Sequence, residues 1–554
     1  MVSKPKFVPP ELGPINAAVA KPLPLYADDH WMSKIWYEVP RGDPAVSEVH
    51  TYTDRMSYDP GDEVVFHSTA TAPEWTLQIY RDGYEPEVVH NVEAIKGVAS
   101  PTPKDAYRSG CNWPVSHRWR LPGDLRSGFY RVVSRCSRPN GGNFVQHHFF
   151  VVRPTEKTRK AKILMVLTTA TWTAYNDFGG ACHYYGIAGD TEDQYSPVLS
   201  LQRPWTRGLI WLPPGAPRFV AEPFPELGDV PRYPVMEWAY SNGFAQYLGS
   251  AGWAQYDRHF LVWAEREGYQ VDIITQTDLH YHPDLLRAYP CVTIVGHDEY
   301  WSREMRLGIE AYVEDGGHLA RFGGNFLWQI RLEDDGQRQV CYKFDAAKDD
   351  PVRGTDQAHS LTTAWEAREV SWPGATTMGV NGAHGVYANW GGFAPLGQKG
   401  LTVYRPSHWA FAGTGLTYAD IFGDKARILG YETDGLDYTF RHGLPYPVKG
   451  DGIPDGIEIL AMAPAVMAEG QSDGEGFRYY VRDVDLVKIV QCLTGGAAPE
   501  DLDRYRYGSA VMVHMNHGKG EVLTAGTCDW VMGLTRRDPR TERITRNILD
   551  RFCG

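Results

Sequence analysis

Two patterns of apolar residues divide this chain. From about Val46 to Pro154, short runs in which apolar and polar residues alternate are separated by turn residues, as in Glu63–Ser68 and Leu77–Arg81. A period of two is typical of half-buried strands, and short strands at regular spacing favour an all-β sandwich. We therefore predict a β-sandwich domain over residues 46–154, preceded by an extended, Pro-rich arm over residues 1–45.

The pattern changes at about residue 160. Ala161–Leu167 and Val271–Ile274 are continuous apolar runs of the kind found in buried strands, whereas Asp257–Gly268 places its apolar residues on one helical face and ends at a glycine. Strands that alternate with helices through short links predict a parallel, three-layer α/β sheet. We assign residues 160–554 to this α/β domain, with a large irregular insertion at about 335–500, where the periodicity is lost.

The most informative segment is Val292–Trp301, in which a β-branched run stops at Gly296 and four polar residues follow. Ligand sites of open α/β sheets lie beyond the carboxyl ends of the strands. The side chains of His297, Asp298, Glu299 and Tyr300 are therefore expected at a functional site. The structural alternative is a simple turn in which Asp298 or Ser302 caps the next helix.

Other polar clusters are open to two interpretations. Asp356, His359 and Asn381 could supply a metal ligand, an acid–base group and an amide, or they could be ordinary surface and turn residues. Glu432 lies in a turn beside Asp434, where carboxylates could bind a metal or stabilise the turn. The Gly-Gly pairs at 179–180 and 323–324 could let backbone approach a ligand or a neighbouring loop.

Charge and composition narrow the partners. The chain of 554 residues has 55 basic and 68 acidic residues, a net charge of −13, and no long basic run. That balance argues against nucleic acid and anionic membranes as partners. We find no apolar stretch near the ~18 residues of a membrane helix and no signal-peptide core at the start, so we expect a cytoplasmic protein.

Several common catalytic motifs are missing from the sequence. We find no HExxH, no GxSxG, no phosphate-binding loop and no Cys/His cluster with zinc spacing. A metal site would thus be assembled from distant segments rich in oxygen ligands. Tyr300 is then of particular interest, because a phenolate is a hard oxygen donor that suits ferric iron.

Taken in order, six segments resemble the family of the N,N-dimethylformamidase large (beta) subunit. The matching segments are Ala174–Gly180, Arg258–Gly268, Gly296–Ser302, Gly323–Asn325, Gly430–Asp434 and Ala525–Trp530. The resemblance covers about residues 160–554, and the β-domain before it is also similar. It implies an α/β core similar to class I glutamine amidotransferases, without their cysteine nucleophile.

The resemblance further implies a mononuclear ferric iron held by two tyrosines and a glutamate, with a histidine and an asparagine assisting hydrolysis. Tyr300 matches one tyrosine, and Tyr256 is our candidate for the other. The family's His-x-Glu is expected about eighty residues after Tyr300, where the sequence offers Asp356 and His359 instead. Glu432 is the alternative carboxylate, and Asn381 matches the asparagine.

Two functions follow as hypotheses. The first is an iron-dependent hydrolase of a small N-substituted amide, with iron bound by Tyr300, Tyr256 and a carboxylate (Asp356 or Glu432). His359 or His297 would relay protons, and Asn381 would orient the substrate. We expect a homo-oligomer, and the resemblance allows a small partner subunit. The second hypothesis is a non-catalytic binding or assembly protein that uses the sandwich and a silent α/β scaffold.

Overall fold

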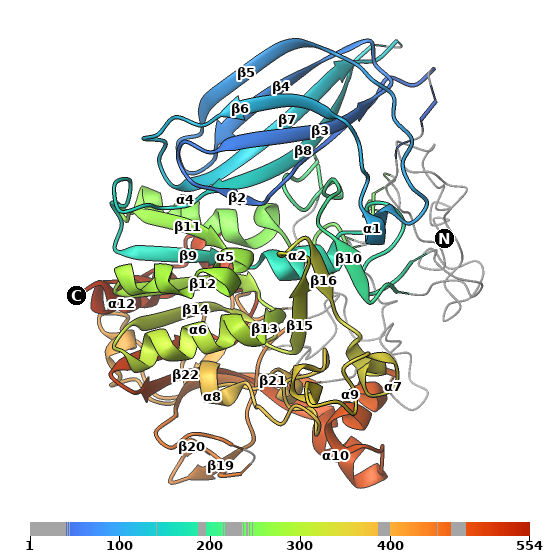
Figure 1. Cartoon of the computed structure of the whole chain (residues 1–554). Coiled ribbons are helices and arrows are strands. Elements are labelled where there is room, and N and C mark those ends of the chain that lie inside the picture. Colours follow the sequence, from blue (N-terminus) through green and yellow to red (C-terminus); the bar gives the residue numbers. More distant parts are fainter. Residues whose placement is uncertain are drawn as a thin grey trace, which may run out of the picture.

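The computed structural model describes residues 40–554, except 41, 44, 140, 187–194, 214, 217–234, 236–237, 240–241, 243, 246, 386–398, 431, 451 and 467–483. The arm predicted for residues 1–45 lies almost wholly outside the described residues. Figure 1 shows a β-sheet layer at the top of the molecule, a helix-covered sheet below it, and a group of shorter elements at the bottom.

The upper part consists of two facing sheets. One contains β1 (Val49–Thr53), β3 (Glu63–Ala70) and β6 (Val115–Arg120). The other has the order β2 (Ser57–Tyr58), β8 (Asn143–Val152), β7 (Gly128–Ser137), β4 (Glu74–Arg81) and β5 (Glu87–Lys96). In β4, the alternate residues Trp75, Leu77 and Ile79 are buried, and they share one core with Phe66 of the opposite sheet. The period of two in the sequence thus gave the correct local structure, while the domain boundaries stay a prediction.

Within this sandwich, His148 of β8 gives the fold a sensitivity to acid. Its Nε2 accepts a hydrogen bond of 3.1 Å from the Thr53 backbone N–H, and burial lowers its pKa to about 3. Between pH 6.5 and 3 the unfolded chain therefore binds a proton that the folded chain does not. The free energy of unfolding falls as pH falls through this window, by about 2 kcal/mol at pH 5.

We expect His148→Gln to reduce this loss, because the amide oxygen of Gln can replace Nε2 as the acceptor but does not titrate. The measurement is the urea midpoint at pH 7 and pH 5 for both proteins. His442→Gln, at an exposed position, serves as the control and should leave the pH dependence unchanged. Equal pH dependence in wild type and His148→Gln would show that His148 does not titrate as expected.

A nine-stranded sheet forms the centre of the lower part. Its order is β11 (Val271–Thr275), β9 (Ile163–Leu167), β12 (Cys291–His297), β14 (His318–Gly324), β23 (Gly520–Thr524), β22 (Tyr507–His517), β21 (Glu458–Val466), β17 (Leu401–Val403) and β18 (Ile421–Phe422). The first five strands pair in parallel and the remaining ones antiparallel. The predicted parallel sheet is therefore correct for one half only, and the whole sheet is mixed.

The antiparallel half corrects the prediction for residues 335–500. Strands β17, β18 and β21 of that region extend the main sheet. The last of these contains three alanines and Pro464 but only two β-branched residues, Ile459 and Val466, so its strand propensity is weak. Pairing with β22 stabilises it regardless of local preference.

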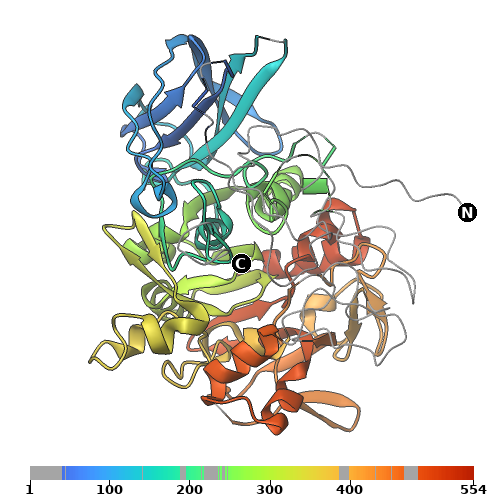
Figure 2. The ribbon, with the colours of Figure 1, turned by 90° about the vertical axis from the view of Figure 1, so that its right-hand side faces the viewer.

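Helices cover both faces of this sheet. On one face lie α4 (Arg258–Arg266), α11 (Trp530–Thr535) and α12 (Pro539–Cys553), and on the other α5 (Gln276–Tyr281), α6 (Arg303–Glu314) and α8 (Ala375–Met378). Alternate residues of β9 point to the two sides: Met165 packs in the core that contains Phe260, and Val166 in the core that contains Met305. The three layers are visible in Figures 1 and 2. The predicted α/β class is confirmed, with helices on both faces of a mixed sheet.

Shorter elements connect these parts. They are α1 (Ala106–Ser109), α2 (Thr169–Tyr175), β10 (Val198–Ser200), the π-helical turn η3 (Trp253–Asp257), η4 (Pro283–Ala288), β13 (Tyr300–Ser302), β15 (Trp328–Glu333), β16 (Arg338–Val340), η5 (Lys343–Asp345), α7 (Ala346–Asp349), η6 (Ala358–Ser360), η7 (Gly382–His384), η9 (Trp409–Phe411), the hairpin β19 (Tyr438–Arg441) and β20 (Leu444–Pro447), α9 (Val484–Thr494) and α10 (Pro499–Arg506). The sandwich is joined to the α/β part by buried contacts. Trp253 stacks on Phe129 with 3.8 Å between ring centroids, and its Nε1 donates to Asp82.

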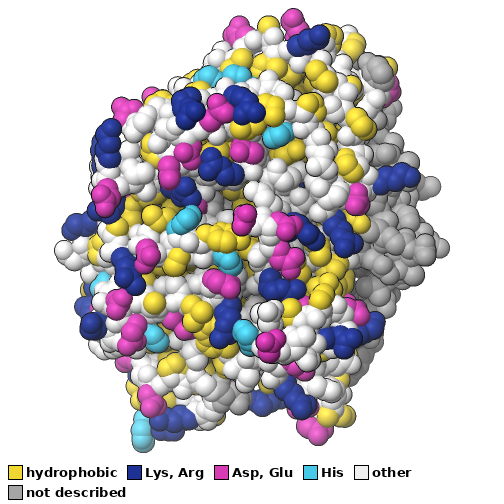
Figure 3. Space-filling model, in the orientation of Figure 1, with side chains coloured by type: hydrophobic (Ala, Val, Ile, Leu, Met, Phe, Trp, Pro, Cys, Tyr) yellow, Lys and Arg dark blue, Asp and Glu magenta, His cyan; other side chains and the backbone are white. Residues whose placement is uncertain are grey.

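The described surface is mixed in charge. Figure 3 shows basic and acidic side chains interspersed over the face in view, so the described residues give this face no broad field of one sign. Among the described residues, no helix combines the length and apolar character needed to cross a membrane.

Candidate metal centre

The candidate site lies where β12 ends. Gly296 has a positive φ of 77°, and a Cβ at this position would collide with the Tyr256 side chain of η3. The glycine thus allows Tyr256 to pack directly against the end of the strand. The next residue, His297, is fully buried, and its Nδ1–H donates to the Ser250 carbonyl over 2.8 Å. That bond fixes the ring and turns Nε2 towards the site.

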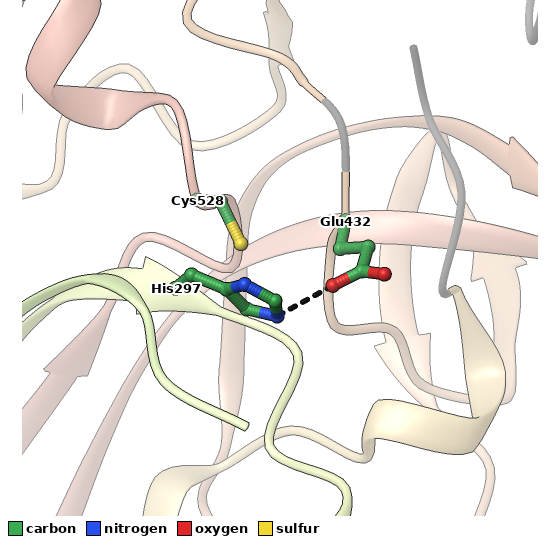
Figure 4. Close-up of side chains that lie close together, drawn as sticks. All are labelled: His297, Glu432 and Cys528. Carbon is green, nitrogen blue, oxygen red and sulfur yellow. Dashed lines mark ion pairs between the residues drawn. The ribbon is translucent and has the colours of Figure 1, made fainter. Parts of the chain in front are cut away.

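Three buried side chains converge at this point. The Nε2 atom of His297 lies 2.6 Å from Oε2 of Glu432, and the ligand atoms of His297, Glu432 and Cys528 all lie within 4.8 Å of one another. Figure 4 shows the imidazole and the carboxylate pointing towards each other, with the sulfur of Cys528 beside them. A nitrogen, a carboxylate oxygen and a sulfur are all ordinary ligands of transition metals.

Unpaired polar atoms surround this cluster. The hydroxyl of Tyr256, Oδ1 of Asn325 and both carboxylate oxygens of Asp529 are buried and have no hydrogen-bond partner among the described residues. Asp529, Cys528 and Glu432 also raise the pKa of the Tyr256 phenol, after burial itself, which places these groups around it. Since buried polar atoms are normally paired, this arrangement fits a site that receives a cation, water or a polar ligand.

The charges of the cluster support that interpretation. Burial alone lowers the pKa of His297, but Glu432 and Glu299 outweigh it and raise the pKa to about 10. The Nε2 atom is also 3.2 Å from Oε2 of Glu299. In the protein without a metal, one imidazolium therefore lies between two buried carboxylates and balances part of their negative charge. A metal cation at this position would balance the same charge.

A layer of hydrogen bonds holds the carboxylates. Asn325, at φ 66° after β14, donates from Nδ2 to Glu432 over 2.7 Å. Oxygens of Glu299 accept from Trp328 Nε1 at 2.7 Å and from the Tyr184 hydroxyl at 2.6 Å. Outer partners of this kind orient ligands and tune a metal site.

Asp298 has a structural role. Its carboxylate accepts from Arg321 Nε at 2.8 Å, and the same guanidinium donates to Asp434 at 2.6 Å. All three side chains are fully buried. Asp434 follows Glu432 by two residues, so this ion-pair brace ties the Glu432 turn to the ends of β12 and β14.

The cap of α6 is Ser302, whose hydroxyl accepts from the Met305 N–H.

The structure brings together some of the predicted residues. His297 and Glu432 are in direct contact, and Tyr256 packs beside them. The hydroxyl of Tyr300 donates to Tyr184 over 2.8 Å, Tyr184 in turn donates to Glu299, and Glu299 contacts His297, so two residues separate Tyr300 from His297.

The remaining predicted residues have other partners or surroundings. Asn381 uses its Oδ1 to accept from the Ala375 N–H, and its backbone pairs with Gly435. Asp356 and His359 are exposed on the segment before and within η6. The structure does not bring these two residues to the His297 cluster.

Sequence reasoning did not single out Cys528, Asp529 or Asn325 as site residues. Each follows the carboxyl end of a parallel strand, Asn325 after β14 and the other two after β23. The rule that led to His297 after β12 would have found them, since the ends of adjacent parallel strands share one edge of a sheet.

A mixed α/β sheet with a buried His–Glu–Cys cluster at this edge defines a candidate metalloprotein. A family model described as "N,N-dimethylformamidase beta subunit-like, C-terminal" matches residues 76–543. The chain belongs to this N,N-dimethylformamidase beta subunit-like family, as the sequence resemblance indicated.

Curated relatives agree with this assignment. The N,N-dimethylformamidase beta subunit of Paracoccus aminophilus is 25% identical over 485 residues, covering 80% of this chain and 54% of that protein. The protein of the same name from Alcaligenes sp is 24% identical over 248 residues, covering 40% of this chain and 28% of that protein. The chain spans about half the length, or less, of these relatives. The sporulation control protein Spo0M of Bacillus subtilis matches at 16% identity and a TM-score of 0.15, over 20% of this chain and 50% of that one, which carries no structural argument.

Proposed function

We propose that this chain is a metal-dependent hydrolase of small N-substituted amides, with its centre at His297, Glu432 and Cys528. The observation that carries the proposal is the buried convergence of these three ligand atoms, beside the Tyr256 hydroxyl and the Asp529 carboxylate, which are unpaired among the described residues. The names of the relatives suggest N,N-dimethylformamide as the first substrate to test. The non-catalytic alternative gives no reason for such a cluster in the core.

The donors fit a first-row transition metal, and we propose iron. Glu432 and the Tyr256 phenol are hard oxygen donors, His297 accommodates either oxidation state, and Cys528 shifts the preference towards a softer ion than an all-oxygen site would hold. When bound, such a metal supplies a Lewis acid that polarises a carbonyl and makes water a stronger nucleophile. The proposed similarity of the core to class I glutamine amidotransferases does not contribute to this assignment.

With the metal bound, side chains of the chain itself would position the substrate and transfer the protons of the reaction. In the balanced reaction, water adds to the amide carbonyl carbon, the C–N bond breaks, and the departing nitrogen takes a proton, which leaves an acid and an amine. Both carboxylate oxygens of Asp529 are buried without a hydrogen-bond partner among the described residues, so Asp529 would accept the water proton and return it to the departing nitrogen. Asn325 Oδ1, which has no hydrogen-bond partner among the described residues, is better placed to position substrate than Asn381, whose Oδ1 is already bonded.

The direct test is turnover of N,N-dimethylformamide, followed by the formate and dimethylamine released. The relatives are named beta subunits, so we further propose that the active form is an oligomer that includes a small subunit, and the assay uses the protein with any copurifying chain. We expect equal amounts of both products, and loss of turnover after chelation. Metal-loaded protein that hydrolyses neither this amide nor other small N-substituted amides would favour the binding-protein hypothesis.

The visible absorption spectrum distinguishes the two predicted tyrosine ligands. Tyr300 is hydrogen-bonded to Tyr184, whereas the Tyr256 hydroxyl has no hydrogen-bond partner in the described part of the chain and could bind a metal. If ferric iron is bound, we expect Tyr256→Phe to abolish the visible phenolate-to-iron absorption band, and Tyr300→Phe to retain it. The measurement is the visible spectrum at equal iron content. Loss of the band in Tyr300→Phe, with retention in Tyr256→Phe, would exchange the two assignments.

A further inference from the structure

A second cluster of possible metal ligands lies on the antiparallel half of the main sheet. His514 on β22 and Glu458 on β21 are direct cross-strand partners, and His408 reaches them from the residue before η9. The Nε2 atom of His408 is 3.2 Å from Nδ1 of His514, and Oε2 of Glu458 is 3.9 Å from the same nitrogen. All three ligand atoms lie within 4.8 Å of one another.

These distances suit a tetrahedral ion. Two nitrogens that are each about 2.0–2.1 Å from a zinc ion at a tetrahedral angle lie about 3.3–3.4 Å apart. The two imidazoles therefore already have the spacing of ligands. The Glu458 side chain is half exposed, at 50%, so its carboxylate can move the remaining distance without repacking the core.

The outer contacts of His514 are those of a metal-bound histidine. Its second nitrogen, Nε2, lies 3.0 Å from Glu521, and that carboxylate is held by Arg551 at 3.1 Å from each of two guanidinium nitrogens. Histidine ligands usually donate their other N–H to a carboxylate in this way, which fixes the ring with its ligating nitrogen turned towards the ion. The bond to Glu521 leaves Nδ1 to face His408 and Glu458.

This cluster is distinct from the His297 centre. Glu521 pairs in register with His318, the first residue of β14, whereas Asn325 of the candidate centre follows the last residue of that strand. His514 itself is level with Ala320, four residues before the end of β14, because it pairs with Leu523 and Leu523 pairs with Ala320. The two clusters therefore lie at different levels along the strands. We propose that His408, His514 and Glu458 form a second, structural site for a divalent transition metal such as Zn²⁺, with water as the fourth ligand.

The role of this site would be to fasten the segment around η9 to the sheet. Without metal, one hydrogen bond joins His408 Nε2 to His514 Nδ1. His408 Nδ1 also accepts a hydrogen bond of 3.2 Å from the Ala410 N–H. Metal binding would put the ion in place of the hydrogen between the two imidazoles. It would also break the 3.2 Å hydrogen bond that His408 Nδ1 accepts from the Ala410 N–H. The inference does not depend on the proposed hydrolase function.

The test is the zinc stoichiometry of the full chain after chelation and titration with Zn²⁺, measured by calorimetry in wild type and in Glu432→Gln. We expect His408→Ala to lower the stoichiometry by one ion per chain in both backgrounds. The matched control is His517→Ala, which removes a partly exposed histidine three residues further along β22 and should leave the stoichiometry unchanged. Glu458→Gln, a milder change at a half-exposed position, should weaken zinc binding at this site at least tenfold.

Unchanged stoichiometry and affinity in His408→Ala and Glu458→Gln would overturn the second site. A melting-temperature rise with Zn²⁺ in Glu432→Gln that disappears in Glu432→Gln/His408→Ala would support it independently of calorimetry. Glu432→Gln impairs the first centre, so zinc binding in this background reports on the second site alone. Failure of the hydrolase proposal would appear as absent amide turnover, whereas failure of this site would appear as unchanged zinc binding in His408→Ala.

Discussion

Glu432→Gln is expected to lower turnover of the amide substrate at least about a thousandfold, which corresponds to about 4 kcal/mol of transition-state stabilisation. The substitution keeps the size of the side chain and its hydrogen bond from Asn325, but it removes the charge that faces His297 at 2.6 Å. A neutral amide is a poor metal ligand, so the bound metal should fall with the activity. The measurements are kcat/KM and metal per chain on the same preparation.

Glu366→Gln is the matched control for this prediction. Glu366 is a largely buried carboxyl that accepts from the Gly374 N–H, and it lies outside the His297 cluster. We expect it to retain both metal and turnover. Full activity in Glu432→Gln would mean that the catalytic centre lies elsewhere in the chain.

Arg321→Met is expected to cause the largest loss of stability among simple substitutions near the site, about 3–5 kcal/mol. The guanidinium is fully buried between Asp298 and Asp434, and its removal leaves two carboxylates without their cation. The measurement is the urea or thermal unfolding transition. Because the same brace positions the Glu432 turn, metal affinity should also fall in the protein that remains folded.

An exposed ion pair provides the comparison. Arg118 and Glu63 lie 2.8 Å apart, with side chains exposed by 54% and 36%. Arg118→Met should cost less than about 1 kcal/mol, because water screens such pairs. Similar losses for Arg118→Met and Arg321→Met would show that the buried brace does not hold the site together.

Much of the fold could be predicted from apolar periodicity. The alternation in β4 and the apolar run of β9 gave the correct local structure, since each records which faces are buried. The antiparallel strand β21 could not be predicted in the same way, because pairing with β22 outweighs its weak local preference. Tertiary contacts decided that part of the sheet.

The candidate site could be predicted only where one strand end marked it. His297 lies directly after an apolar run, whereas Glu432 is 135 positions further along the chain, and only the folded structure brings the two side chains into contact. Asp356 and His359 were suggested by spacing from Tyr300, and spacing cannot show that a segment is exposed. Cys528 matched a family segment, but nothing in its own sequence context separated a ligand from a buried thiol.

The most direct test of the metal centre is a crystal structure with anomalous diffraction recorded on both sides of the absorption edge of the bound metal. We expect one strong anomalous peak per chain within ligand distance of His297 Nε2 and Glu432, with Cys528 or Tyr256 completing the site, in protein from metal-replete cells. A map without a peak at this position, from protein that is active on amides, would contradict it.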